Sequence, residues 1–115
     1  MSRDVQLCAQ ESGRRITVGE DCMFSNNIIV RTSDSHPIFD KESDERENYS
    51  RDVFIGKHVW IAPNSKIFKG VSIGEGAVIG SDTLVTKDVP AYSLAVGHPA
   101  KIVRSGIKWT RDDIF

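Results

Sequence analysis

The stretch IGKHVW IAPNSK IFKGVS IGEGAV IGSDTL VTKD, residues 55–88, decides the fold of this 115-residue chain. A branched aliphatic residue opens each block of six, and the register does not slip across the stretch. The aliphatic positions are Ile55, Ile61, Ile67, Ile73, Ile79 and Val85. A repeat this strict indicates a chain of similar structural units that stack on one another.

A period of six differs from the 3.6-residue period of a helix and from plain strand alternation, so the chain must turn after each short strand. Four residues after each aliphatic stands a second, mostly small, inward residue: Val59, Ser65, Val71, Ala77, Thr83 and Val89. Three blocks make one triangular turn of a parallel β-solenoid, an all-β fold of about three turns here. This geometry predicts that Ile55 stacks on Ile73, and Ile61 on Ile79.

Glycine follows the aliphatic in several blocks, as at Gly56, Gly74 and Gly80. The absence of a side chain permits either a positive φ or a close approach to the neighbouring strand, and the sequence leaves both open. Phe68 occupies the same position and is expected at a corner or in an outward contact.

The repeat continues upstream of residue 55 and is interrupted once. Earlier blocks open at Val18, Phe24 and Val30, with Cys22 and Ile28 at the second inward positions. Residues 1–15 are weakly patterned and predict an N-terminal cap or a truncated first turn, with a possible strand through Val5, Leu7 and Ala9. Residues 32–52 hold Pro37, a charge run and turn-forming residues, so we expect an excursion loop thrown out from one corner. Long loops in compact domains are often functional.

The C-terminal segment, residues 105–115, is expected to cap the last turn, because a solenoid needs a covered end. Thr110 followed by Arg111, Asp112 and Asp113 resembles an N-cap with acidic first-turn residues, which predicts a short helix between Trp109 and Phe115. The whole chain is therefore expected to form a single domain.

Composition excludes several classes of function. The formal net charge of −1 gives no indication of nucleic-acid binding. No apolar run is long enough to span a membrane, and the start MSRDVQL lacks the features of a signal peptide, so a cytoplasmic protein is expected. Cys8 and Cys22 are too few for a disulfide framework, and Cys22 is expected to pack as a small hydrophobe. Outward aromatic residues on so thin a prism favour self-association around a three-fold axis. These are Phe54, Trp60 and Phe68.

The run VFIGKHVWIAPNSKIFKGVSIGEGAVIGSDTLVTKDVPAYSLAVGHPAKIVR, residues 53–104, resembles the C-terminal half of the hexapeptide-repeat acyltransferases, which form a left-handed parallel β-helix. RTSDSHPIFD, residues 31–40, resembles the active-site segment of the branch that O-acetylates sugars and capsular polysaccharides. The resemblance implies an acetyl-CoA-dependent acetyltransferase, a homotrimer with active sites between subunits, and a sugar or glycan acceptor. Family members are longer at the N-terminus, so a short member or a fragment is expected.

Acetyl transfer to a hydroxyl needs a base that works near neutral pH, and histidine suits this task. The resemblance assigns that role to His36. Asp34, two residues earlier, is either the acceptor that orients the imidazole or a partner of a backbone amide, and the spacing leaves both open. Direct attack on the thioester needs no covalent enzyme intermediate. The oxyanion donor is expected to be a backbone amide of the facing subunit.

Coenzyme A requires backbone edges for its pantetheine arm and cations for its phosphates. By resemblance, the cofactor-binding residues are Trp60, Ala62, Pro63, Gly80, Ser81, Thr86, Lys87, Lys101 and Arg104. The candidates for holding the acceptor are Glu11, Asn27 and Tyr49.

Two other functions fit the sequence. The first is a non-catalytic trimeric scaffold, in which the solenoid is kept and the site is lost. The second is a metal site like that of the carbonic anhydrases built on the same solenoid. His36, His58 and His98 lie far apart in register, whereas zinc needs three or more convergent ligands, so no metal is expected. His58 is expected on the surface, and His98 is given no role.

Overall fold

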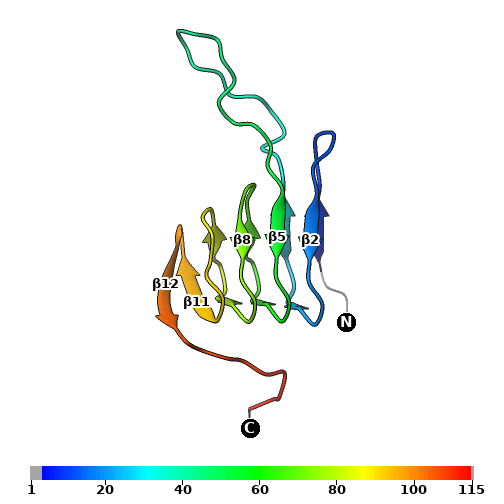
Figure 1. Ribbon diagram of the computed structural model, residues 1–115, viewed down its shortest axis with the longest axis vertical. Coiled ribbons are helices and arrows are strands. Elements are labelled where there is room, and N and C mark those ends of the chain that lie inside the picture. The colour runs from blue at the N-terminus through cyan, green and yellow to red at the C-terminus, as the bar shows by residue number, and fades with distance from the viewer. Residues whose placement is uncertain (1–3, 115) are drawn as a thin grey trace.

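Three parallel sheets form the sides of a triangular prism in the computed structural model, which describes residues 4–114 (Figure 1). The sheet orders are β1-β4-β7-β10, β2-β5-β8 and β3-β6-β9-β11-β12. The strands are β1 Val5–Cys8, β2 Ile16–Val18, β3 Met23–Phe24, β4 Ile28–Arg31, β5 Val53–Ile55, β6 Trp60–Ile61, β7 Lys66–Ile67, β8 Ser72–Ile73, β9 Val78–Ile79, β10 Leu84–Val85, β11 Ser93–Gly97 and β12 Ala100–Ser105.

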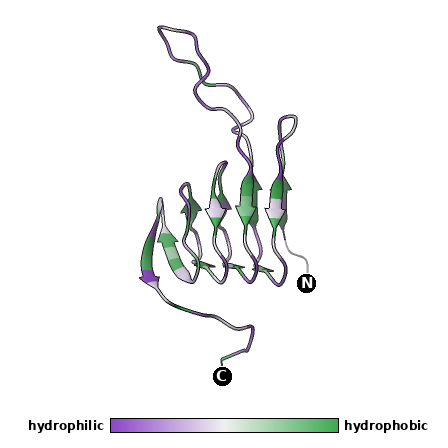
Figure 2. Cartoon of the chain, viewed as in Figure 1, coloured by the Kyte–Doolittle hydropathy of each residue, from purple (hydrophilic) through white to green (hydrophobic). Residues whose placement is uncertain are grey.

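The stacking predicted from the six-residue repeat is confirmed. Ile55 pairs with Ile73 across β5 and β8, and Ile61 pairs with Ile79 across β6 and β9. Both rows of inward side chains are buried, and they form one core along the prism axis. Figure 2 shows the hydropathy of the chain, with apolar strands around the axis and a mostly hydrophilic excursion. The inward aliphatic residues therefore fix the register of each coil on the next.

The glycines that follow the aliphatic residues allow close approach between coils. A Cβ built on Gly74 would lie 2.4 Å from the backbone nitrogen of Ala91, and one on Gly56 would lie 3.0 Å from that of Glu75. Positive φ occurs instead two residues later, at the corners of five successive blocks. The residues in that conformation are His58, Asn64, Gly70, Gly76 and Asp82. Phe68, partly exposed, lies just after β7 at a corner, as expected.

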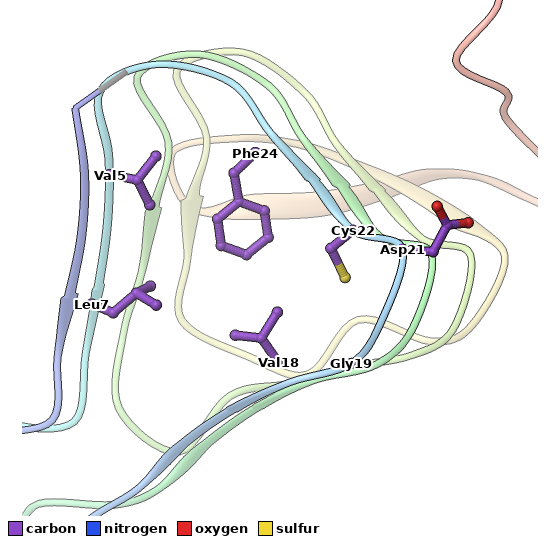
Figure 3. Close-up of a pocket in the computed structure, with 7 residues that line it drawn as sticks. All are labelled: Val5, Leu7, Val18, Gly19, Asp21, Cys22 and Phe24. Atoms are coloured by element: carbon purple, nitrogen blue, oxygen red, sulfur yellow. The ribbon is translucent and has the colours of Figure 1, made fainter. Parts of the chain in front are cut away.

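The upstream blocks form a complete first coil, and β1 precedes it. Val18 pairs with Ile55, and Leu7 pairs with Val30, which settles the register of the first strand. An open hollow of about 520 Å³ lies at this end of the prism. Figure 3 shows Val5, Leu7, Val18, Cys22 and Phe24 pointing into it. Cys22 is thus an inward residue, as predicted, and its thiol lies 3.1 Å from the carbonyl oxygen of Gly56.

The excursion, residues 32–52, leaves the prism between β4 and β5 and projects along the longest axis of the molecule (Figure 1). Phe39 and Arg46 form an antiparallel bridge across it. The carboxylate of Asp40 accepts the backbone N–H groups of Glu42 and Ser43, which closes the tip. The predicted loop is therefore a narrow hairpin-like arm.

The C-terminal prediction is wrong in one respect. The structure contains no helix among residues 4–114, and hence none that could span a membrane. The last coil is covered instead by β12, which pairs antiparallel with β11. Residues 106–114, the C-terminal strap, then run back beneath the coils in extended form (Figure 1). So short a helix would be marginal in water. Trp109 and Arg111 gain contacts with the prism from the extended chain.

Candidate functional site

The His36 corner is the edge of the prism where β1, β4, β7 and β10 end. His36 lies at the base of the excursion, and its side chain is exposed. No hydrogen bond to its imidazole occurs within residues 4–114, whereas its backbone carbonyl accepts the side-chain amide of Asn48 at 2.9 Å. The imidazole is therefore accessible, and its position is set through the backbone.

Asp34 is bound by two partners other than His36. Its Oδ2 accepts Lys69 Nζ at 2.5 Å and Asn48 Nδ2 at 2.9 Å. The Lys69 ammonium is the main cause that lowers the pKa of Asp34, while burial opposes the shift. The carboxylate therefore ties the start of the excursion to the next coil in this structure.

Glu11, a candidate for acceptor binding, anchors the excursion. Its carboxylate accepts both terminal nitrogens of Arg46, at 3.2 and 2.8 Å, and the hydroxyl of Ser33 at 2.5 Å. The bonds from Arg46 and then Ser33 lower the pKa of Glu11 to about 2. Arg46 also lies over the ring of Tyr49, 5.1 Å from its centroid, and that tyrosine is exposed.

The Gly80 corner lies at the opposite end of the same sheet, where β4, β7 and β10 begin. Successive backbone bonds run Ala62 N–H to Ile79 O and Gly80 N–H to Ala95 O. Ala62 and Gly80 therefore lie on neighbouring coils. Pro63 and Ser81 follow them, and Ser81 is exposed. Asn27 lies on this edge too, where its side-chain amide donates to Asn64 at 2.7 Å.

Lys101 and Arg104 extend the Gly80 corner onto β12. On a regular strand, two residues three positions apart would face opposite sides of the sheet. Here the register shifts, so that Lys101 pairs with Val96 and Arg104 pairs with Leu94. Because those partners are two residues apart, both cations lie on one face. A Cβ on Gly80 would lie 2.9 Å from Val96, which links this face to the corner. Both cations are exposed, and neither forms an ion pair within residues 4–114.

The His58 corner, between β5 and β6, binds the C-terminal strap. Trp109 stacks on His58 with ring centroids 4.0 Å apart, and its indole donates to the carbonyl of His58 at 2.8 Å. The imidazole bonds Asp21 at 2.7 Å and the Trp109 carbonyl at 3.0 Å, and these acceptors raise the pKa of His58. His58, expected on the surface, is therefore partly covered.

Trp60 lies beneath the strap, 6.0 Å from the ring of Trp109. Its indole nitrogen is buried and has no hydrogen-bond partner within residues 4–114. A buried N–H of this kind is costly unless it is satisfied. Trp60 is therefore a side chain whose polar atom residues 4–114 leave unsatisfied.

Within one chain, the predicted site residues lie at different corners of the prism. His36, Asp34 and Glu11 lie at the His36 corner, as do Thr86 and Lys87, two coils further along. The remaining cofactor candidates, apart from Trp60, lie along the Gly80 corner and β12. The sheet between these corners is about 15 Å wide, taking 3.3 Å per residue. Thus Thr86 and Lys87 do not lie with Gly80 and Lys101 in one chain.

No cluster of three or more His, Cys, Asp or Glu side chains suited to a metal ion occurs within the described part of the chain. His58, the most strongly bonded of the three histidines, is occupied by Asp21 and the C-terminal strap. The arrangement of histidines therefore offers no convergent ligand set among residues 4–114.

Sequence reasoning missed Asn48 and Lys69 at the His36 corner. Asn48 is 8% exposed, and its side chain bonds four groups of the excursion. For Asn48, the only sequence signal was its position in a turn-like stretch. For Lys69 there was none, since it is one cation within a six-residue block. Their partners lie 14 and 35 residues away, so only the coiling of the chain reveals them.

The repeat matches the family model for bacterial transferase hexapeptide repeats (six repeats) over residues 52–87. Together with the similarities below, this match shows that the chain belongs to the hexapeptide-repeat transferase family, as its motifs suggest.

Particular relatives are polysialic acid O-acetyltransferases. The chain is 49% identical over 98 residues to that of Escherichia coli O1:K1 / APEC, covering 85% of this chain and 32% of the relative. It is 40% identical over 107 residues to that of Neisseria meningitidis, covering 92% and 49%. The crystal structure of the polySia-specific acetyltransferase NeuO matches with a TM-score of 0.92 and 43% identity, over 96% of this chain and 50% of that one. The chain spans half or less of the length of these relatives.

Proposed function

We propose that the chain forms the cofactor-binding and catalytic part of an acetyl-CoA-dependent O-acetyltransferase that modifies a hydroxyl of a sugar polymer. The observation that carries the proposal is the similarity to polysialic acid O-acetyltransferases across 85% of the chain, in a segment that includes the repeat. A sialic acid polymer is the first acceptor to test, because the named relatives act on that polymer.

His36 is the proposed general base. Its exposed imidazole removes the proton of the acceptor hydroxyl as the oxygen attacks the thioester carbonyl. The tetrahedral oxyanion then collapses, the carbon–sulfur bond breaks, and the proton passes from the imidazolium to the departing thiolate. The acetyl group thus moves from sulfur to oxygen, and no covalent enzyme intermediate forms.

The Gly80 corner is the proposed seat of coenzyme A. Ala62, Gly80 and Ser81 leave a small-residue edge along which a pantetheine arm could lie. Lys101 and Arg104, on one face and without ion pairs in the described chain, suit the nucleotide phosphates. Since this corner lies about 15 Å from the His36 corner, we propose that the two meet across a subunit boundary, in a trimer.

The excursion is the proposed acceptor wall, with the exposed Tyr49 ring on it. Aromatic faces offer an apolar surface with a polar hydroxyl, which suits a sugar ring. Glu11 is proposed to act on the acceptor only indirectly, because Ser33 and Arg46 already occupy its carboxylate.

The experiment that tests this function measures thiol release from acetyl-CoA in the presence of colominic acid (a sialic acid polymer), free sialic acid or a neutral sugar. The parent protein is expected to release thiol with at least one acceptor. His36→Ala should lower that rate by about 10²- to 10⁴-fold, the usual contribution of general base catalysis. His98→Ala is the matched control and should keep the parent rate. Equal rates for His36→Ala and the parent would refute the mechanism.

A further inference from the structure

The Asn48 side chain makes four hydrogen bonds within the excursion, and nothing in its sequence neighbourhood marks it as functional. It is 8% exposed, although it lies on an arm whose neighbouring residues, Glu47 and Tyr49, are exposed. A polar side chain buried in this way is kept in place by its hydrogen bonds. The bonds of Asn48 therefore show what it holds.

Every bond of the Asn48 side chain to residues 34–38 falls on alternate residues around His36. Its Oδ1 accepts the N–H of Ile38 at 2.6 Å, and its Nδ2 donates to the carbonyl of His36 and to Asp34 Oδ2, both at 2.9 Å. One amide thus fixes Asp34, two residues before the histidine, the histidine itself, and Ile38, the residue after Pro37. The peptide that carries the imidazole is held on both sides.

Asn48 is itself tied to the prism through two charged pairs. Arg46 donates to the Asn48 carbonyl at 3.2 Å and binds Glu11 of the β1–β2 loop through both of its terminal nitrogens. Asp34, held by Asn48, also binds Lys69 of the next coil. The network therefore connects the segment around His36 to two separate coils of a rigid core.

We propose that Asn48 is a positioning residue for the transfer reaction, one that sets the place of the His36 imidazole through its backbone. The proposal rests on the proposed function. The imidazole has no hydrogen-bond partner of its own within residues 4–114, so only its backbone can aim it. Misplacing a catalytic group by about 1 Å can cost on the order of 100-fold in rate.

The first test uses acetyl transfer by Asn48→Ala, compared with the parent and with Glu20→Gln, a change on an exposed side chain outside the excursion. Asn48→Ala is expected to lower kcat by roughly 10- to 100-fold, with less than about a two-fold change in KM for acetyl-CoA. Glu20→Gln should match the parent. A merely structural role would lower the folded fraction and leave kcat per folded molecule unchanged. That outcome would overturn the proposal.

A second measurement keeps the failure of this inference distinct from failure of the proposed function. Hydrogen exchange of the Ile38 amide reports the bond to Asn48 Oδ1, whether or not the protein transfers acetyl groups. The amide should be protected in the parent and in Glu20→Gln, and should lose that protection in Asn48→Ala. An equally fast Ile38 exchange in the parent would overturn the proposed network. An inactive parent with a protected Ile38 amide would refute the reaction, and with it the role of Asn48 in that reaction.

Discussion

At the scale of single residues, glycine in several blocks and a positive-φ residue two places later have separate roles at the corners. The glycine after the inward aliphatic lets the coils approach closely, while a residue two places later takes a positive φ. Glycine, asparagine, aspartate and histidine fill the second place, and all four adopt that conformation more often than other residues. The two requirements are therefore separate and can be tested separately.

Replacing Gly74 by alanine is expected to destabilise the fold by about 1–3 kcal/mol, because the new Cβ would overlap the backbone of Ala91. Gly56→Ala should cost less, since its Cβ would lie no closer than 3.0 Å to Glu75. Neither glycine has a positive φ, so conformational strain does not enter the comparison. Urea unfolding of both variants measures the difference. A larger loss for Gly56→Ala would contradict the close-approach explanation.

The sequence predicted the inward residues well and the site contacts poorly, for one physical reason. Inward positions recur every six residues, so Ile61 and Ile79 could be placed from spacing alone. Site partners recur with no period. Asp34 meets Lys69 across 35 residues, and nothing in the local pattern distinguishes Lys69 from other surface cations. Spacing left Asp34 as either a partner of His36 or a partner of a backbone amide, whereas in the structure its carboxylate binds Lys69 and Asn48.

At the scale of elements, the C-terminal strap is the part that differs most from expectation. It bonds Tyr92 on the last coil through the N–H of Ile107, then His58, then Asp21 on the first coil. Thr110 does accept the N–H of Asp112, the local bond that suggested a helix start, but no helix follows. Contacts 51 and 90 residues away in sequence set its conformation, and local capping chemistry cannot reveal such contacts.

Docking of the strap is expected to depend on pH. The Trp109 carbonyl and then Asp21 raise the pKa of His58 by favouring the charged ring, against the opposing effects of burial and then of Arg111. A raised folded pKa means that this stabilisation is complete below the unfolded pKa of about 6.5 and is lost as pH rises through the folded value. The hydrogen bond with His58 is the main cause that lowers the pKa of Asp21. On the acidic side, the stabilisation from this pair is therefore lost only below the ordinary pKa range of aspartate.

Hydrogen exchange of the Trp109 indole N–H measures this docking, because that group donates to the His58 carbonyl. Protection, corrected for the intrinsic pH dependence of exchange, should be greatest near pH 5 and should fall by about pH 8. In His58→Gln the pH dependence should disappear. Protection that stays constant over this range in the parent would contradict the assignment of a charged His58.

At the scale of the whole molecule, the rigid prism holds the His36, Gly80 and His58 corners apart, so these corners do not meet within one chain. The His36 corner carries the proposed base and the excursion. The Gly80 corner carries the small-residue edge that leads to Lys101 and Arg104. The repeat predicted the three-sided shape from sequence alone. The structure was needed to assign residues to corners, because that assignment depends on the strand at which the chain re-enters the repeat after the excursion.

A subunit-mixing experiment tests most directly the central claim that the two corners complete one site across a subunit boundary. His36→Ala removes the proposed base, and Ser81→Trp places a bulky ring at an exposed position on the Gly80 corner. Each variant alone should be nearly inactive in acetyl transfer. In a randomly mixed trimer, half of the subunits supply an intact His36 and half an intact Ser81. The activity should therefore recover to about a quarter of the parent value. A mixture that stays as inactive as either variant, while the parent is active, would contradict the account.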